Sequence, residues 1–450
     1  MGVNIFKRKI YSKLVAWKNK SAGRTALMIE GARRVGKSTI AEEFVRNEYD
    51  SYLIIDFTKT KSDIINLFDD LSDLHYFFLS LQSLTGTRLT PGRSCIIFDE
   101  VQFCPKARQA IKHLVKDGRY HYIETGSLIS IRKNTKDILL PSEERRIEMY
   151  PMDFEEFLWA IGREPTFDLI RYSYQKMKPL GDSVNRELMK LFRLYMLVGG
   201  MPQAISEYIH GSNFEAVDEV KRDIINLYLD DLKKIDDKGR ASTIFRSIPA
   251  ELARNTIRYR VGEVIEKARL SRLEEIFSDI DDSKTVNFAY HANDPNVGFA
   301  LHAGYDYFKM FLGDTGLFVT LAFMDKDFTE NTIYQKLLVD KLPADLGYIY
   351  ENVVAQLLKS SGHSLYYYTF KDRVGETVEP RSYEIDFLIS RQDKICPIEV
   401  KSSGYKAHKS LDMFQQKYSA RIQQRYLLYT KDLRKDDNII CLPVYMAGLL

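Results

Sequence analysis

The 450-residue sequence predicts a multidomain α/β protein, and three observations support this prediction. The length corresponds to about three domains of ordinary size. Over residues 1–160, short apolar strands alternate with segments of helical periodicity, an order typical of a parallel sheet covered by helices. Apolar residues make up 45% and charged residues 28% of the chain, which excludes intrinsic disorder. The net charge of +3 is too small to indicate a nucleic-acid partner by itself.

The first strand is expected over residues 25–30 (TALMIE) and the first helix over residues 38–48, with a glycine-rich loop between them. The loop has the pattern G-x-x-x-x-G-K-S. Its glycines let backbone N–H groups turn toward phosphates, Lys37 supplies a cation for the β and γ oxygens, and the Ser38 hydroxyl can reach Mg²⁺. The sequence therefore predicts a nucleoside triphosphate site formed by Gly31, Arg34, Gly36, Lys37, Ser38 and Thr39.

Two further strands are expected at residues 51–57 and 94–100, separated by a mostly helical segment. The second of them, SCIIFDE, ends in Asp99 and Glu100, which is the arrangement of a Walker B element. A carboxylate at the carboxyl end of a strand can hold Mg²⁺, and the next acid can orient or deprotonate the attacking water. We therefore expect Asp99 and Ser38 to bind the metal, and Glu100 and Lys37 to act in hydrolysis.

The strand expected at residues 120–127, YHYIETGS, ends in a threonine and a serine. Thr125 and Ser127 could contact the γ-phosphate or the attacking water from a strand beside the Walker B strand. Alternatively, the TGS sequence is only turn chemistry. Both interpretations stay open, and Ser127 is included among the expected catalytic residues.

A cation that compensates charge on the γ-phosphoryl oxygens is expected in the segment PSEERRIEMYPMDFEEFL. Arg145 or Arg146 could act as such an arginine finger, within this chain or toward a neighbouring subunit. The alternative is that each arginine is solvated and paired with Glu143 or Glu144. Arg146 is included among the expected catalytic residues.

The order of the motifs GARRVGKST, CIIFDEVQ, IETGSLIS, RRIEMYPMDFEEFL and LYMLVGGMPQAI resembles that of a family of prokaryotic AAA-like ATPases. These proteins carry a C-terminal domain of unknown function related to PD-(D/E)xK nucleases. The resemblance covers essentially the whole chain and implies ATP as the nucleotide, with Ser127 near the sensor position. Members usually have a Gly-Arg pair before the YP segment, where this chain has Glu144, Arg145 and Arg146, so the identity of the finger stays open.

The middle of the chain is expected to be helical over residues 161–240, with a sharp turn at Gly199 and Gly200. These helices could form a lid over the nucleotide, or they could serve only in structural packing, and both interpretations stay open. Residues 241–330 suit a winged-helix-like domain, which the resemblance also implies, and such modules often bind DNA. Residues 253–272 are basic enough for phosphate contacts, although a basic helix is usually a solvated face. The GDTGL segment most simply makes a tight connection.

Charged residues interrupt two apolar strands near the C-terminus, in YEIDFLIS and PIEVKSS. Glu399 and Lys401 share one face because side chains at i and i+2 point together, Asp386 lies on the preceding strand, and Glu351 on a helix could be a fourth member. Two carboxylates can bind Mg²⁺ while a lysine positions water against a phosphodiester, which is the logic of a PD-(D/E)xK nuclease. Alternatively, these residues form an internal salt-bridged cluster that does not cut. Additional phosphate contacts could come from Lys406, His408 and Lys409, or these side chains could simply face solvent.

Together these features predict a P-loop NTPase sheet at residues 1–160, a helical lid at 161–240, the winged-helix-like domain at 241–330 and an α/β restriction-endonuclease-like domain at 331–450. The expected function is that of a Mg²⁺-dependent ATPase controlling a nuclease-like, nucleic-acid-engaging domain. The alternative is an ATP-driven protein-remodelling or signalling ATPase with an inactive nuclease-like fold. DNA and a second copy of the chain are candidate partners. Four scattered cysteines, the lack of a signal peptide and the lack of an apolar run of about 18 residues predict a cytoplasmic protein without a membrane span.

Overall fold

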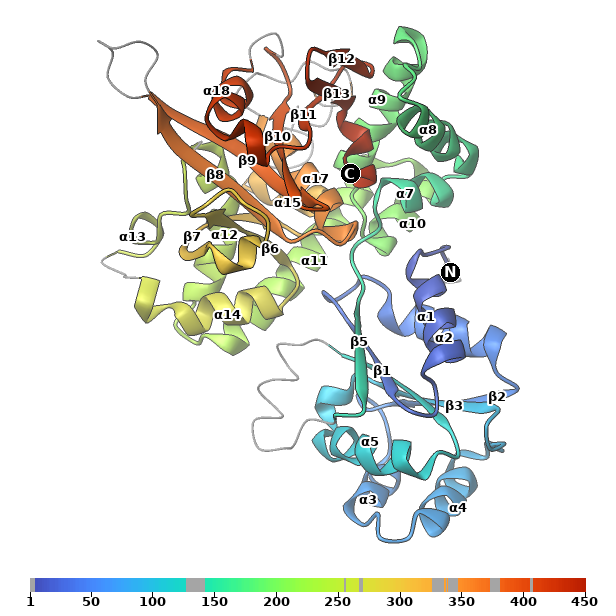
Figure 1. Cartoon of the computed structure of the whole chain (residues 1–450). Coiled ribbons are helices and arrows are strands. Elements are labelled where there is room, and N and C mark those ends of the chain that lie inside the picture. Colours follow the sequence, from blue (N-terminus) through green and yellow to red (C-terminus); the bar gives the residue numbers. More distant parts are fainter. Residues whose placement is uncertain are drawn as a thin grey trace. The chain divides into compact units, whose positions relative to one another are not determined.

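The chain forms two compact units in a computed structural model that describes residues 5–126, 142–254, 256–266, 270–325, 336, 338, 347–372, 381–404 and 408–450. The first unit is Met1–Tyr150 with Asp282–Lys284, and the second is Pro151–Asp281 with Thr285–Leu450. Figure 1 colours both units along the sequence. Each unit is described by itself.

A five-stranded parallel sheet forms the centre of the first unit, in the order β2-β3-β4-β1-β5. Its strands are β1 (Ala26–Glu30), β2 (Ser51–Asp56), β3 (Ser94–Asp99), β4 (His121–Thr125) and β5 (Glu144–Glu148). Every residue of β1 and β3 is buried, which requires cover on both faces of the sheet. The parallel sheet expected from the alternating strands and helices is confirmed.

The helices of the first unit pack against this sheet, and they are α1 (Ile10–Lys20), α2 (Lys37–Glu48), α3 (Ser62–Asn66), α4 (Leu74–Thr85) and α5 (Pro105–Asp117). Local sequence explains where several of them begin and end. The Asp73 carboxylate accepts hydrogen bonds from the first backbone N–H groups of α4. Helix α5 starts with a proline at its first turn and ends at Gly118, whose φ of 75° is left-handed.

Helices make up much of the second unit, and they are α7 (Phe154–Ala160), α8 (Glu164–Lys176), α9 (Asp182–Val198), α10 (Pro202–Gly211), α11 (Phe214–Ile235), α12 (Arg240–Ala253), α13 (Val261–Val264), α14 (Glu274–Asp282), α15 (Thr315–Ala322), α17 (Gly347–Ser360) and α18 (Lys409–Tyr418). The helical character expected for residues 161–240 is confirmed, and their role as a lid stays a prediction. None of the described helices has the length and apolarity that a membrane span requires.

A mixed eight-stranded sheet runs through the second unit, in the order β12-β13-β11-β10-β9-β8-β6-β7. Its strands are β6 (Val286–Ala292), β7 (Ala303–Leu312), β8 (Leu365–Asp372), β9 (Arg381–Arg391), β10 (Lys394–Lys401), β11 (Arg425–Tyr429), β12 (Arg434–Asp436) and β13 (Ile439–Pro443). Strands β6 and β7 come from the segment expected to be a winged helix, yet β6 pairs in parallel with β8 and both extend the C-terminal sheet. This arrangement does not confirm the winged-helix or nuclease-like folds, and the four-part division stays a prediction.

Candidate functional site

The glycine-rich loop connects the end of β1 to the start of α2 through three left-handed backbone positions. The φ angles are +151° at Gly31, +67° at Arg34 and +98° at Gly36. A Cβ atom on Gly31 would lie 2.2 Å from the carbonyl oxygen of Met149, so a side chain has no room there. Lys37 begins α2, and its Nζ donates to the carbonyl oxygens of Gly31 and Ala32, each at 2.9 Å. The lysine is therefore held inside its own loop.

The Walker B carboxylate lies directly beside the first turn of α2. The Ser38 hydroxyl donates to Asp99 Oδ1 at 2.6 Å, and the Thr125 hydroxyl donates to the same oxygen. Asp99 ends β3 and Thr125 ends the neighbouring strand β4, so parallel pairing brings both side chains to one edge of the sheet. The backbone N–H of Glu100 donates to Thr125 Oγ1 at 3.3 Å. Three motifs that are far apart in the sequence thus meet at one carboxylate.

Glu100 has a left-handed backbone, with a φ of 53°, immediately after β3. Its carboxylate accepts a hydrogen bond from the side-chain amide of Gln102, a buried residue two positions later. Gln102 was not among the residues predicted from the sequence. The motif DEVQ contained the signal, because a polar residue that follows the acid pair can hold the second acid in place.

Burial lowers the pKa of Lys37 to about 8, although the carboxylates of Glu100 and Asp99 act in the opposite direction. The physical cause is the loss of hydration of an ammonium group inside the protein. Arg34 is exposed and Thr39 is half-buried in the same loop and first helical turn. Ser127 lies outside the described residues, and the same holds for Lys406.

Arg146 lies on β5 and takes part in ion pairs within the first unit. Its Nε lies 2.7 Å from Glu144 Oε1, and its NH1 lies 3.3 Å from Glu30 Oε1. Glu144 also pairs with the fully buried Arg108, at 3.0 Å. Arg145 donates to the hydroxyl of Ser21 at 3.2 Å. The ion-paired alternative thus describes Arg146 in this structure, and an arginine finger stays a prediction.

The expected C-terminal constellation gathers where β9, β10 and α17 lie near one another. Lys401 Nζ pairs with Glu399 Oε1 at 2.8 Å, and the backbone N–H of Val400 donates to Asp386 Oδ2 at 2.7 Å. Glu399 Oε2 is buried and has no hydrogen-bond partner among the described residues. Glu351, from α17, interacts electrostatically with Asp386 and Lys401. The four expected residues are thus close enough to influence one another's charge.

Two further residues belong to this carboxylate–lysine cluster, which we define as Lys309, Glu351, Glu384, Asp386, Glu399 and Lys401. Lys309 on β7 is buried and forms an ion pair with Glu384 on β9. It also interacts electrostatically with Glu351 and Asp386. Neither residue could be predicted from the sequence, because β7 precedes β9 by about 70 positions and only strand pairing brings them together.

Burial raises the pKa of Asp386 well above its ordinary value, and the nearby carboxylates of Glu351, Glu384 and Glu399 raise it further. Burial also raises the pKa values of Glu351 and Glu399. For Lys401, burial lowers the pKa, but the carboxylates of Glu399, Asp386 and Glu351 together more than offset this, so the pKa lies above its ordinary value. The cluster contains four acids and two lysines, so protons or a bound cation would relieve its excess negative charge.

Within the part of the chain that the structure describes, no three acidic, histidine or cysteine side chains are placed to hold one metal ion together. A cation at the carboxylate–lysine cluster would therefore rely on fewer protein carboxylates, with water or substrate completing its shell. Near the cluster, His408 Nδ1 lies 2.8 Å from Asp412 Oδ2, while Lys409 starts α18 and is exposed. His408 is thus engaged within the protein.

The parallel sheet, the phosphate loop and the Walker B carboxylate define the first unit as an ATPase-like P-loop domain. Residues 23–158 match the family model of the AAA domain. Residues 189–327 and 346–446 match two domains of unknown function, DUF8612 and DUF4143. These matches support an AAA-like ATPase in the first unit, and the relation of the C-terminal segment to nucleases stays a prediction.

Several solved structures are similar to the chain at low identity. A Walker-type ATPase of Pyrococcus abyssi has 14% identity and a TM-score of 0.43, over 70% of this chain and 96% of that one. Cdc6p from Pyrobaculum aerophilum has 11% identity and a TM-score of 0.25, over 76% and 97% of the two chains. The ORC1 protein of Aeropyrum pernix, solved in complex with DNA, has 12% identity and a TM-score of 0.29, over 71% and 93%. No curated protein matches the chain.

Proposed function

We propose that the first unit binds ATP together with Mg²⁺ and hydrolyses it. The observation that carries this proposal is that Ser38 and Thr125 donate to the same oxygen of Asp99 beside the loop that holds Lys37. The hydroxyl of Ser38 and the carboxylate of Asp99 are oxygen ligands of the kind that Mg²⁺ prefers, and they lie 2.6 Å apart. A Cβ atom at Gly31 would clash with the Met149 carbonyl oxygen, so glycine is needed for the loop to take this path.

Each residue at this site has a distinct task in the proposed reaction. Lys37 would exchange its two carbonyl partners for phosphate oxygens, and the loop N–H groups would donate to the same phosphates. Ser38 and Asp99 would hold Mg²⁺, which supplies positive charge against the β and γ oxygens when bound. Glu100, oriented by Gln102, would align the attacking water and accept its proton. Ser127 and Arg146 are proposed to assist the reaction, within this chain or toward a neighbouring subunit.

Two substitutions test the proposal by separating binding from turnover. Lys37→Ala should abolish binding of a fluorescent ATP analogue. Among the described residues, Lys37 is the only buried cation of the loop, and this substitution removes it. Glu100→Gln should retain binding and slow phosphate release by roughly 100-fold, the typical contribution of a general base. Lys59→Ala is the matched control, because that side chain is 80% exposed in the same unit. Undiminished turnover in both active-site variants would refute the proposal.

As a second function, we propose that the carboxylate–lysine cluster cleaves nucleic acid with the help of Mg²⁺. The supporting observation is the unpartnered, buried Glu399 Oε2 next to Lys401, in a cluster with an excess of acids. Asp386 and Glu399 would hold the cation, and Lys401 would position water against the phosphodiester. In this proposal the 331–450 segment is the nuclease-like domain, and the 241–330 segment, including its predicted winged helix, contributes to the engagement of nucleic acid.

Strand integrity tests this second function in the same purified protein. Plasmid and short single-stranded substrates incubated with Mg²⁺ should be cut by the wild type, and Asp386→Asn or Lys401→Ala should slow cutting by roughly 100-fold or more. Lys435→Ala, an exposed residue on β12, serves as the control. Equal cutting by all variants would indicate a contaminant. Intact substrates with the wild type would favour the alternative, a protein-remodelling or signalling ATPase with an inactive nuclease-like fold.

A further inference from the structure

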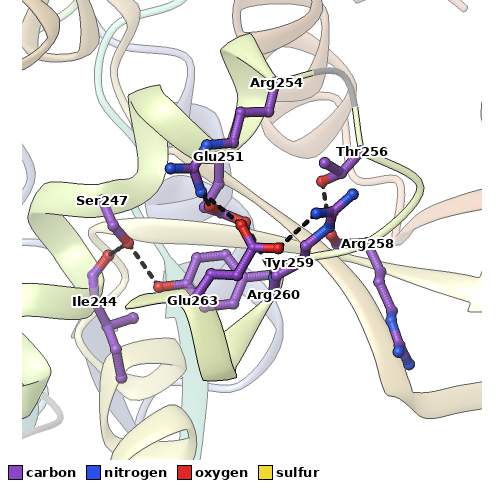
Figure 2. A network of polar contacts seen from close by, with 9 residues as sticks. All are labelled: Ile244, Ser247, Glu251, Arg254, Thr256, Arg258, Tyr259, Arg260 and Glu263. Atoms are coloured by element: carbon purple, nitrogen blue, oxygen red, sulfur yellow. Dashed lines mark hydrogen bonds and ion pairs between the residues drawn. The ribbon is translucent and has the colours of Figure 1, made fainter. Parts of the chain in front are cut away.

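An arginine-rich segment follows α12 in the second unit, and Figure 2 shows its polar contacts. Two of its arginines are neutralised. Arg254 NH1 lies 2.5 Å from Glu251 Oε1 and 3.0 Å from Glu263 Oε2, and Arg260 NH1 lies 2.5 Å from Glu263 Oε1. These ion pairs hold the segment in place.

Tyr259 fixes the same segment from inside. Its ring is buried against Phe308, with centroids 6.1 Å apart, and its hydroxyl lies 2.6 Å from the Ser247 hydroxyl. Arg258 precedes this anchor, and in Figure 2 its side chain extends away from the ion-paired arginines. The buried tyrosine and the two ion-paired arginines therefore set the direction in which Arg258 projects.

Arg258 is an exposed cation without an ion pair to any residue that the structure describes. Its guanidinium lies 4.4 Å from the centre of the Tyr307 ring, in a cation–π contact. A guanidinium in such a contact still has N–H groups that can donate hydrogen bonds to an anion. Arg258 and Tyr307 together therefore present a cation and an aromatic ring on the surface.

Tyr307 lies on β7, the edge strand of the sheet, and is 44% exposed. Phe308 pairs with Tyr290 and Gly304 pairs with His291, so residues 305–307 form a bulge with no counterparts on β6. A bulge at a sheet edge changes the direction of its side chains. The Tyr307 ring lies 6.3 Å from the half-buried His291, whose ring lies 5.3 Å from Tyr367. Tyr367 is fully buried, so these ring contacts run from the exposed Tyr307 at the sheet edge into the interior.

The buried end of these ring contacts lies beside the carboxylate–lysine cluster. Lys309 Nζ lies 5.5 Å from the centre of the Tyr367 ring and pairs with Glu384. Arg258 and Lys309 also line one small cavity of about 10 Å³. The Tyr367 hydroxyl is buried and has no hydrogen-bond partner among the described residues. A buried polar atom without a partner is costly, which is consistent with a ligand or water at this point.

We propose that Arg258, Tyr307 and His291 form a binding surface for single-stranded nucleic acid at the sheet edge near the carboxylate–lysine cluster. A phosphate would pair with Arg258, and a base would stack on the Tyr307 ring or on the guanidinium plane. Double-stranded ligands are excluded because the faces of paired bases are already covered by their neighbours. This inference rests on the proposed nucleic-acid function of the cluster and adds the class of substrate and its binding surface.

Fluorescence anisotropy with labelled oligo-dT and oligo-U of about 15 nucleotides tests the inference, since this length exceeds a typical site for one small domain. The buffer contains EDTA, so that cutting cannot affect the signal. Arg258→Ala and Tyr307→Ala should each weaken binding by roughly tenfold or more, and Tyr307→Phe should retain it, because stacking needs the ring alone. A blunt hairpin duplex of equal length should bind more weakly. Tyr172→Ala, a 53% exposed tyrosine on α8, is the control.

Unchanged affinity in both alanine variants, equal affinity for the duplex, or no binding by the wild type would overturn the inference. Circular dichroism melting of each variant checks that lost binding is not lost folding. Lys435→Ala, the exposed control on β12, should bind the single strand as the wild type does. Tyr307-dependent binding without any cutting by the wild type would refute the proposed cleavage while supporting the binding surface, so the two proposals fail separately.

Discussion

Lys37 illustrates how a single residue can be prepared for an anionic ligand. Burial lowers its pKa to about 8, and its ammonium group is held by the carbonyl oxygens of Gly31 and Ala32. A protonated lysine would pair with phosphate oxygens, whereas a neutral one would not. Above pH 8, the free protein therefore has to take up a proton before this pair can form.

The affinity for ATP should therefore decrease as the pH rises. Below pH 8 Lys37 is already protonated, so the affinity should be nearly constant. Above it, the apparent dissociation constant should rise toward tenfold per pH unit, because binding takes up one proton. Calorimetric titration from about pH 7 to pH 9.5 measures this slope. Lys37→Arg should show no such slope if it binds ATP, because the guanidinium stays charged. A flat profile for the wild type would contradict the proposed uptake of a proton by Lys37.

At the scale of elements, two glycine-containing turns of the second unit pack against each other. Gly199 and Gly200 separate α9 from α10, and Asp314 precedes α15. The buried Asp314 carboxylate accepts a hydrogen bond from the Gly200 N–H at 2.5 Å, and a Cβ on Gly316 would lie 2.5 Å from Gly199 Cα. The sequence predicted a sharp turn at the first motif and a tight connection at GDTGL, and their mutual contact explains why both need glycine.

Replacing Gly200 with alanine should destabilise the second unit, because the new Cβ would lie 2.1 Å from the Met152 carbonyl oxygen. The expected loss in the free energy of unfolding is about 1–3 kcal/mol, which is typical of overpacking. Gly211→Ala is the matched control at the end of α10, where the nearest atom to the new Cβ lies 3.8 Å away. Denaturant unfolding measures both variants, and equal stability of the two would show that the turn can relax.

At the scale of the whole molecule, the chain changes unit between Tyr150 and Pro151. The Met149 N–H donates to the Glu30 carbonyl at 2.8 Å inside the first unit, and the Met152 N–H donates to the Gly200 carbonyl at 2.7 Å inside the second. Only two residues lie between these two fixed points. Each end of this short connection is therefore held by its own unit, one beside the phosphate loop and one at the α9–α10 turn.

The proposed ATP site could be predicted from the sequence because its residues come from short local motifs. Gly31, Lys37, Ser38 and Asp99 lie in a loop or at a strand end, and a parallel sheet brings strand ends to one edge whatever the details of packing. The constellation of Asp386, Glu399 and Lys401 could also be predicted from the sequence, because side chains alternate along adjacent strands. Periodicity and charge in apolar strands were sufficient signals.

Only the tertiary structure decided the partners that come from distant segments. Strand pairing of β6 with β8 places β7 in the C-terminal sheet, which brings Lys309 to Glu384. A backbone hydrogen bond from Tyr259 to Phe308 brings Arg258 to Tyr307. The structure shows that Arg146 forms ion pairs with Glu144 and Glu30, whereas the sequence left its role open. Local patterns specify which residues can form a strand or a loop. They do not specify which distant strand lies beside it, because that depends on packing energy summed over the whole sheet.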